Sequence, residues 1–495
     1  MGDISVPQSS RQLLLPLITL RDASSTDGGL PRSERIYANR NLPLTHIDWL
    51  GFDMDYTLAI YQQEAMDALS VEVTIDNLVS FGYPEYLRNL KYDSRFPIRG
   101  LHIDRQLGNV LKMDRFAAIH KGYHGFRRLD REEIRAAYWE TKVVPDSERF
   151  RWIDTLFELS EVTSYVSIIE AMERRKERMD YPRLLEDIRR AIDLGHHNGT
   201  VHSRVLADLP RYVNRDPNLA LTLHKLRSAG KKLFLLTNSP LPYTQRMMEY
   251  LLGESMPEYR SWELFFNVII VAARKPLWFR GEEPFHYYHE GKPQPGVNDL
   301  ERGVIYGGGN LKEFERLLGI RGARVLYVGD HIYGDIVRSK KESAWRTAMI
   351  IQELDAELAA HQGSAAHIRK KLELDEGRTR QEDELRFYQR RLKALHRHDE
   401  EPPDEAEERR IRRGLERVRA TLGRMNEEQE QLEQTIDTSF HPYWGSLLKE
   451  QGELSNFGAQ VERYADVYMP RVSCLQHYSA EQFFRSPHDF MPHEL

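Results

Sequence analysis

Short apolar runs alternate with helical patterns along much of the chain. Mainly apolar runs occur at 47–52, 231–236, 266–272, 324–329 and 345–351. Runs of this kind are typical of strands buried on both faces of a parallel sheet. Apolar positions at helical spacing predict helices at 71–86, 217–229 and 311–318. The alternation predicts an α/β fold built on a parallel sheet.

Two regions interrupt this rhythm. After the first core strand, 109–120 reads as paired strands and 147–195 as mainly helical, which we interpret as an inserted cap domain. Further along, 368–395 and 411–436 are strongly charged, with apolar residues at spacings of three and four. This pattern predicts an antiparallel helical hairpin that protrudes or mediates oligomer contacts, although a solvated charged face without a partner fits equally well.

These patterns divide the chain into five parts. We expect the first part of the core at 42–115, the cap at 116–200, the second part of the core at 201–355, the hairpin at 364–440, and a C-terminal segment at 441–495. The C-terminal segment is rich in Tyr and Phe, so we expect it to pack on the core or on a partner subunit.

The first core strand ends in two carboxylates, Asp53 and Asp55. Their spacing of two places both on one face at the carboxyl end of the strand, where open α/β sheets bind ligands. Neighbouring carboxylates repel and separate their pKa values, so one can act as an ionised nucleophile or metal ligand while the other carries a proton. An isolated Asp-x-Asp is equally consistent with a strand that ends in a solvated turn.

Other strands also end in residues suited to phosphate chemistry. Thr237 and Asn238 can hold phosphate oxygens without adding negative charge, and they also fit a helix cap. Lys275 can screen a phosphate from an aspartate; we favour it over Lys292 because Lys275 directly follows a strand. Asp330 and Asp335 offer the oxygen ligands that Mg²⁺ prefers.

Composition narrows the class of protein. The chain has 495 residues, of which 40% are hydrophobic and 29% charged, with a formal net charge of -6. This describes a globular, water-soluble protein and does not favour nucleic-acid binding through bulk charge. The single cysteine, Cys474, rules out an internal disulfide and fits a reducing cytoplasm. The apolar stretch at 13–18 is too short to span a membrane, and no targeting segment is visible.

Taken in order, these strand ends resemble the four motifs of the haloacid dehalogenase (HAD) superfamily of phosphatases. The segments at 51–58, 92–100, 273–276, 327–335 and 491–494 further resemble the cytosolic purine 5′-nucleotidases that prefer IMP and GMP. The resemblance extends from about residue 34 to 494. It implies a HAD-like, Rossmann-type parallel core with an inserted cap, followed here by the charged hairpin.

The resemblance also implies roles for the residues at the strand ends. Asp53 would attack phosphorus to form a phospho-aspartyl intermediate, and Asp55 would act as general acid and then general base. Mg²⁺ would be held by Asp53, the Asp55 carbonyl and Asp330, with Asp335 nearby. Thr237, Asn238 and Lys275 would bind the phosphate.

Base recognition follows the family less closely. The resemblance implies an aromatic stacked on the purine, matched to Phe126, and a polar wall of Arg189, Asp193 and His196. Phe126 alone fits core packing equally well. Arg127, also expected at the substrate, stands where the family carries Asn, while His197 replaces Tyr and His202 replaces Lys. These changes leave the base preference open.

We therefore expect a Mg²⁺-dependent purine 5′-nucleotidase, with phosphotransfer to nucleosides implied by the family. The resemblance also implies a cytoplasmic homo-oligomer, a dimer or tetramer, activated by nucleotide effectors, and neither nucleic acid nor membrane is an expected partner. Two rivals remain: a HAD phosphatase for another small phosphomonoester, and an interaction protein built on a HAD scaffold.

Overall fold

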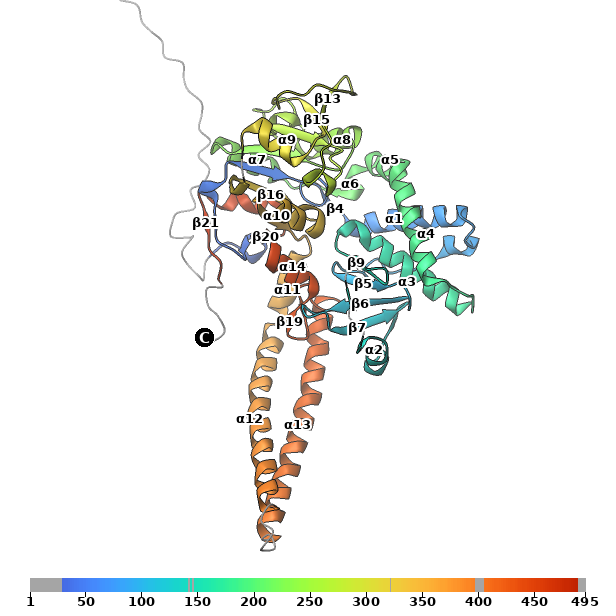
Figure 1. Ribbon diagram of the computed structural model, residues 1–495, viewed down its shortest axis with the longest axis vertical. Helices are drawn as coiled ribbons and strands as arrows, with labels where there is room; N and C mark the ends of the chain where they lie inside the picture. The colour runs from blue at the N-terminus through green and yellow to red at the C-terminus, as the bar shows by residue number, and fades with distance from the viewer. Residues whose placement is uncertain (1–28, 141–142, 145–146, 321, 397–404, 488–495) are drawn as a thin grey trace, which may run out of the picture.

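A computed structural model describes residues 29–140, 143–144, 147–320, 322–396 and 405–487 (Figure 1). Two stretches named above lie outside these residues: the apolar stretch at 13–18 and the motif at 491–494.

A ten-stranded sheet forms the core of the described residues. From β20 to β15 every neighbouring pair is parallel, and β1, β13 and β14 add antiparallel edges. The strand order is β1 (Tyr37–Ala38), β20 (Val467–Met469), β17 (Arg346–Ile350), β16 (Val325–Gly329), β3 (Trp49–Phe52), β11 (Lys232–Leu236), β12 (Val268–Val271), β15 (Ile305–Gly308), β13 (Phe285–His289) and β14 (Lys292–Gln294). The predicted α/β class and parallel sheet are confirmed.

The central strands are buried on both faces. All four residues of β3 are buried, and its neighbours β11 and β16 carry large side chains on the face that Gly51 leaves open. A Cβ at Gly51 would lie 2.1 Å from the Phe234 ring, so glycine allows this close approach. The core helices are α7 (Leu219–Ser228), α8 (Leu241–Leu252), α9 (Leu311–Leu318) and α10 (Arg338–Glu342).

The cap is a separate five-stranded antiparallel sheet with its own helices. Its strand order is β8 (Arg127–Arg128), β7 (Ile119–His124), β6 (Asn109–Met113), β5 (Leu101–Asp104) and β9 (Phe150–Ile153). The helices of this region are α1 (Gln63–Ser80), α2 (Arg131–Tyr138), α3 (Leu159–Arg174), α4 (Tyr181–His197), α5 (Thr200–Ala207) and α6 (Leu209–Tyr212).

The boundary expected between core and cap at 115/116 differs from the structure. β5 and β6, which we assigned to the core, pair with β7 and β9, and α1 packs against α3 and α4 of the cap. The chain leaves the core after β4 (Ile60–Tyr61) and returns through β10 (Val213–Asn214), and these two short strands pair with each other. This pairing marks where the insertion starts and ends.

The predicted helical hairpin is confirmed. Helices α12 (Ala365–Leu395) and α13 (Glu405–Phe440) lie side by side and extend far from the body of the molecule (Figure 1). Ile411, Leu415 and Val418 are buried in their interface, and a Cβ at Gly414 would lie 2.7 Å from the Tyr388 ring. Charged pairs such as Arg391–Glu407, at 2.7 Å, join the two helices along their flanks.

The described part of the C-terminal segment returns to the core. β20 enters the central sheet beside β17, and β21 (Phe483–Phe484) pairs with β2 (Leu42–Pro43). The segment also contains β18 (Lys449–Glu450), β19 (Glu453–Leu454) and α14 (Asn456–Tyr464), while α11 (Leu354–Gly363) connects the core to the hairpin.

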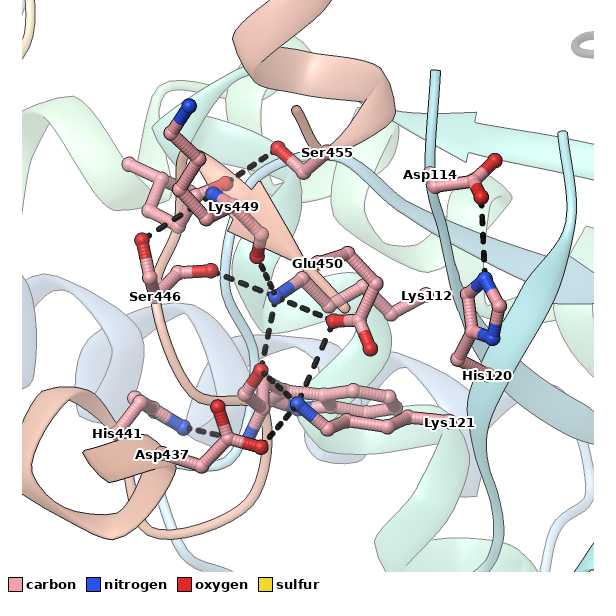
Figure 2. A network of polar contacts seen from close by, with 12 residues as sticks. Lys112, Asp114, His120, Lys121, Asp437, His441, Ser446, Lys449, Glu450 and Ser455 are labelled. Carbon is pink, nitrogen blue, oxygen red and sulfur yellow. Dashed lines mark hydrogen bonds and ion pairs between the residues drawn. The ribbon is translucent and has the colours of Figure 1, made fainter. Parts of the chain in front are cut away.

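Buried ion pairs join the cap sheet to the segment that follows the hairpin (Figure 2). Lys112 of β6 lies 2.8 Å from the Glu450 carboxylate and donates to the carbonyl oxygens of Trp444, Ser446 and Lys449. Lys121 of β7 pairs with Asp437, at the end of α13, at 2.6 Å. Polar contacts therefore link the cap to the base of the hairpin.

None of the helices in the described ranges combines the length and apolar character needed to cross a lipid bilayer.

Candidate active site

The four strand ends singled out in the sequence meet at one edge of the central sheet. β3 lies between β11 and β16, and β12 lies beyond β11, so their parallel carboxyl ends are neighbours. The Asp53 N–H donates to the Val328 carbonyl and the Thr237 N–H to the Ile270 carbonyl, which extends the sheet bonding into the loops. Residues far apart in sequence are thereby placed within contact distance.

Lys275 lies at the centre of this edge. Its Nζ is 2.9 Å from Asp53 Oδ1 and 2.7 Å from Asp335 Oδ1, and it donates to the Tyr327 hydroxyl. Burial alone would lower the pKa of Lys275, but the adjacent carboxylates of Asp335 and Asp53 outweigh it and raise that pKa well above its ordinary value. The side chain is therefore an ammonium, as the sequence argument required.

Three carboxylates form a compact acidic cluster. One oxygen each from Asp53, Asp330 and Asp335 lies within 4.8 Å of the others. Burial, reinforced by the charge of Asp335, raises the pKa of Asp330 to about 7. Burial also raises the pKa of Asp53 well above its ordinary value, and Lys275 opposes this shift.

This cluster fits a hard divalent cation. The Asp330 Oδ2 atom is buried and has no hydrogen-bond partner in the part of the chain that the structure describes. A buried, unpartnered carboxylate oxygen on a member of an acidic cluster is a strong candidate ligand, and an all-oxygen donor set suits Mg²⁺. Asp53, Asp330 and Asp335 are therefore the residues whose carboxylates could hold the ion.

The Asp55 carboxylate is held by hydroxyl groups. Tyr61 donates to Oδ1 and the Ser239 hydroxyl to Oδ2, both at 2.6 Å, and the Thr237 hydroxyl lies 3.5 Å from Oδ2. The Tyr243 hydroxyl adds a further contact, 2.8 Å from that of Tyr61. The Asp55 carboxylate is thus oriented separately from the acidic cluster.

Sequence reasoning missed the tyrosines in this set. Tyr61 lies on β4, past the turn that follows Asp55, and Tyr243 lies on α8 of the core. A tyrosine six residues from a candidate acid was the available signal, but nothing local indicated that the chain turns back toward Asp55.

A cavity of about 420 Å³ opens from these residues toward the cap. On the core side Asp53, Asp55, Asn238, Ser239 and Lys275 line it. The Asn238 side chain accepts from the Lys275 N–H at 2.6 Å and donates to its carbonyl, so it also fixes the lysine loop. The cavity therefore connects the reactive edge of the sheet with the inserted domain.

The cap wall contains most of the polar residues expected at the base. Arg189, Asp193 and His196 of α4 all line the cavity, as does His202 of α5. The His202 ring lies 4.3 Å from that of Tyr243. Burial lowers the pKa values of His196 and His202, so both rings are biased toward the neutral form.

The structure places Phe126 and Arg127 away from this cavity. The Phe126 ring packs edge-on against Phe96, with centroids 5.3 Å apart, and Arg127 is exposed and paired with Glu133. The aromatic residue that lines the cavity is Phe157, which is 38% exposed. Phe157 falls between the buried residues Leu156 and Leu159, and an aromatic residue off this apolar stripe was the available sequence signal.

Charged cap residues also approach the loop after β16. His331 lies 3.2 Å from Asp154 at the end of β9, and this ion pair joins the cap to the core. Although burial lowers it, the Asp154 charge raises the pKa of His331 to about 10. Glu158 lines the same cavity, and burial raises its pKa to about 7.

The aspartate pair, buried lysine and acidic cluster on a parallel sheet define a HAD-type phosphatase core. Residues 36–495 match the model of the 5′ nucleotidase family, and the chain belongs to that family. It is 31% identical over 473 residues to a 5′-nucleotidase domain-containing protein of Dictyostelium discoideum, covering 93% of this chain and 75% of that protein. Membership supports a phosphoric monoester hydrolase acting on nucleoside monophosphates.

Solved structures are similar over part of the chain. CbbY from Rhodobacter sphaeroides shares 16% identity, with a TM-score of 0.23 over 61% of this chain and 86% of that one. L-2-haloacid dehalogenase from Xanthobacter autotrophicus shares 12% identity, with a TM-score of 0.20 over 61% of this chain and 77% of that one.

Proposed function

We propose that this protein hydrolyses purine 5′-monophosphates of the IMP and GMP type to nucleoside and phosphate, with Mg²⁺ as cofactor. The observation that carries the proposal is the Lys275 ammonium 2.9 Å from Asp53, at the floor of a cavity that extends to Arg189 and Phe157. The Lys275 charge at the floor suits a phosphate, and the aromatic ring and guanidinium at the far wall suit a nucleotide base.

Asp53 is the nucleophile in this proposal. Its carboxylate attacks phosphorus as the bond to the nucleoside O5′ breaks, giving a phospho-aspartate. Lys275 offsets the repulsion between the anionic carboxylate and the anionic phosphate. A bound Mg²⁺ would supply further positive charge at the phosphate oxygens. Burial raises the pKa of Asp53 and Lys275 opposes that shift, and a bound Mg²⁺ would favour the carboxylate further.

Asp55 moves the protons. It gives a proton to the departing O5′, then takes one from the water that attacks the phospho-aspartate, which releases phosphate and restores Asp53. Its hydrogen bonds to Tyr61 and Ser239 hold both carboxylate oxygens, so its orientation is set before substrate enters.

The cap supplies selectivity for the base. Phe157 offers an aromatic face, and Arg189 offers donors suited to the carbonyl oxygen of a 6-oxopurine. His202, in place of the family's Lys, leaves a ring biased toward the neutral form at this wall. A preference for IMP or GMP over AMP is the expected result.

The test is phosphate release from a panel of nucleoside monophosphates and sugar phosphates, with Mg²⁺ or with EDTA. We expect turnover of IMP or GMP that needs Mg²⁺ and is abolished in Asp53→Asn. The matched control is Asp48→Asn, which changes a carboxylate at the opposite end of β3 that pairs with Arg324. Turnover unchanged in Asp53→Asn would refute the mechanism. Activity confined to sugar phosphates would refute the substrate and favour the rival phosphatase.

Phosphotransfer follows if nucleoside exchanges before water attacks the phospho-aspartate. Adding labelled inosine during GMP turnover should then give labelled IMP, and its absence would count against the transfer. The cytoplasmic location, nucleotide activation and homo-oligomeric state implied by the family stay predictions. Measuring the size of the protein in solution, with and without nucleotides, is the first test of the oligomeric state.

A further inference from the structure

A buried arginine joins the cap, the core and the start of α11. Arg99, just before β5, has a fully buried side chain. Its Nη1 donates to the main-chain oxygen of Asp330 at 2.9 Å, while Nε and Nη2 bind the two carboxylate oxygens of Glu353 at 2.8 and 2.5 Å. The guanidinium also lies over the Phe457 ring, 4.9 Å from its centroid. The hydrogen bonds to Asp330 and Glu353 are directional, so together they hold the guanidinium in one orientation.

The residue before Glu353 holds the other acidic loop. Gln352 Nε2 donates to the Tyr56 carbonyl at 2.9 Å, in the turn that follows Asp53 and Asp55. Two consecutive side chains at the start of α11 therefore reach both loops that carry the acidic cluster, Gln352 directly and Glu353 through Arg99.

The Asp330 loop needs such support. Asp330 Oδ2 makes no hydrogen bond within the described chain, so the position of this carboxylate depends on the backbone that carries it. A two-pronged guanidinium–carboxylate pair is geometrically specific, and an arginine held this way can fix the carbonyl that it contacts. Lysine, with one point charge, cannot make the same set of contacts.

We propose that Arg99, Glu353 and Gln352 form a positioning brace that presets the cation site of Asp53, Asp330 and Asp335. The brace rests on the proposed function for the identity of the cation. None of its members lines the cavity found beside Lys275, so they act on the reaction through the loops that they hold.

The matched variants are Glu353→Gln and Arg99→Lys, with Asp355→Asn as control. Asp355 lies on α11, two residues after Glu353. It pairs with Arg471 of the C-terminal segment and not with a loop that carries the acidic cluster. The full-length protein is titrated with Mg²⁺ by calorimetry in the absence of substrate, and thermal unfolding shows which variants are folded. Gln352→Leu removes the hydrogen bond from Gln352 to the Tyr56 carbonyl, and its effect is measured as a change in kcat.

We expect Glu353→Gln and Arg99→Lys to weaken Mg²⁺ binding about tenfold or more, as changes to groups that orient metal ligands commonly do. Asp355→Asn should bind Mg²⁺ like the wild type. Gln352→Leu should lower kcat about tenfold with KM little changed, because small displacements of reacting groups are costly.

Folded Glu353→Gln and Arg99→Lys proteins with wild-type Mg²⁺ affinity would overturn the brace, as would an equal loss in Asp355→Asn or a wild type that binds no Mg²⁺. The titration needs no substrate, so its outcome is independent of the nucleotide assay. Weakened Mg²⁺ binding in a protein that hydrolyses no nucleotide would support the brace and refute only the proposed substrate.

Discussion

Replacing Lys275 with methionine removes the ammonium at the centre of the site while keeping a side chain of similar length. The ammonium lies 2.9 Å from Asp53 Oδ1, so a phosphate that reaches Asp53 comes within about 4 Å of it. Two unit charges about 4 Å apart attract by about 4 kcal/mol at an effective dielectric constant of about 20. Water and any bound cation offset part of this attraction.

We therefore expect Lys275→Met to lose about 3 kcal/mol of transition-state stabilisation, on the order of 10² to 10³ in kcat/KM. The assay is phosphate release from IMP at saturating Mg²⁺. Thermal unfolding in the same buffer establishes that the variant is folded.

Lys292 provides the matched control, because it also precedes a proline but is exposed on β14. Lys292→Met should keep wild-type kcat/KM. A folded Lys275→Met enzyme within threefold of the wild type, or an equal loss in Lys292→Met, would show that the buried ammonium is not what brings phosphate to Asp53.

Three further predictions concern the cap. Phe157→Ala should raise KM about tenfold with kcat nearly unchanged, since stacking on a base is worth about 1–3 kcal/mol. Phe126→Ala should lower the melting temperature and leave KM unchanged. The opposite pattern would restore Phe126 as the base contact. Burial raises the pKa of Asp67 to about 8, so the folded state holds a proton that the unfolded state releases, and stability should fall as pH rises from 5 to 8. Urea unfolding should show a smaller fall in Asp67→Asn, by about 1.4 kcal/mol for each pH unit over which only the folded state holds this proton. Parallel curves would show that Asp67 ionises normally. Lys112→Met should lower the free energy of unfolding by about 3–5 kcal/mol, because it leaves the buried Glu450 carboxylate with only the more distant Lys121, at 3.4 Å. A change below 1 kcal/mol in urea denaturation would mean that Lys121 alone compensates the Glu450 charge.

Much of the core could be predicted because its signals are local. A buried parallel strand is a short apolar run, and a chemically distinctive residue directly after it must lie at the carboxyl edge of the sheet. Asp53, Thr237 and Asp330 obey this rule, while Lys275 follows β12 after the short loop at 272–274, and the structure brings the four together. The hairpin was visible for a similar reason, since its apolar spacing depends on only two adjacent helices.

The extent of the cap could not be predicted in the same way. The pattern at 109–120 correctly indicates paired strands, and no pattern singled out β5 at 101–104. Alternation of apolar residues does not say which sheet a strand joins. That choice depends on pairing with β7 and β9, and on the short β4–β10 pair, which joins residues about 150 positions apart. The expected boundary at 115 therefore divided one antiparallel sheet.

The aromatic residue at the cavity shows a second limit. Phe126 and Phe157 are chemically alike, and either could stack on a base. Which one does so depends on tertiary packing: Phe96 faces Phe126, with the two ring centroids 5.3 Å apart, while Phe157 extends past the core and remains 38% exposed. Phe157 lies off the apolar stripe of its segment, but Phe126 lies in the turn between β7 and β8, so no single sequence pattern separates the two.

Long-range polar contacts explain how the parts are held in register, and these contacts leave almost no trace in sequence. Arg99 reaches Glu353 and Lys112 reaches Glu450, across more than two hundred residues in each case, and a charged residue that will be buried resembles any surface charge. Glu357, one turn after Glu353, accepts from the Ser446 hydroxyl at 2.7 Å, where the chain returns from the hairpin. The start of α11 thus contacts the acidic loops on one side and the hairpin's return on the other. Because a buried ion pair loses several kcal/mol when one partner moves away, cap, core and hairpin base are expected to shift together and not independently.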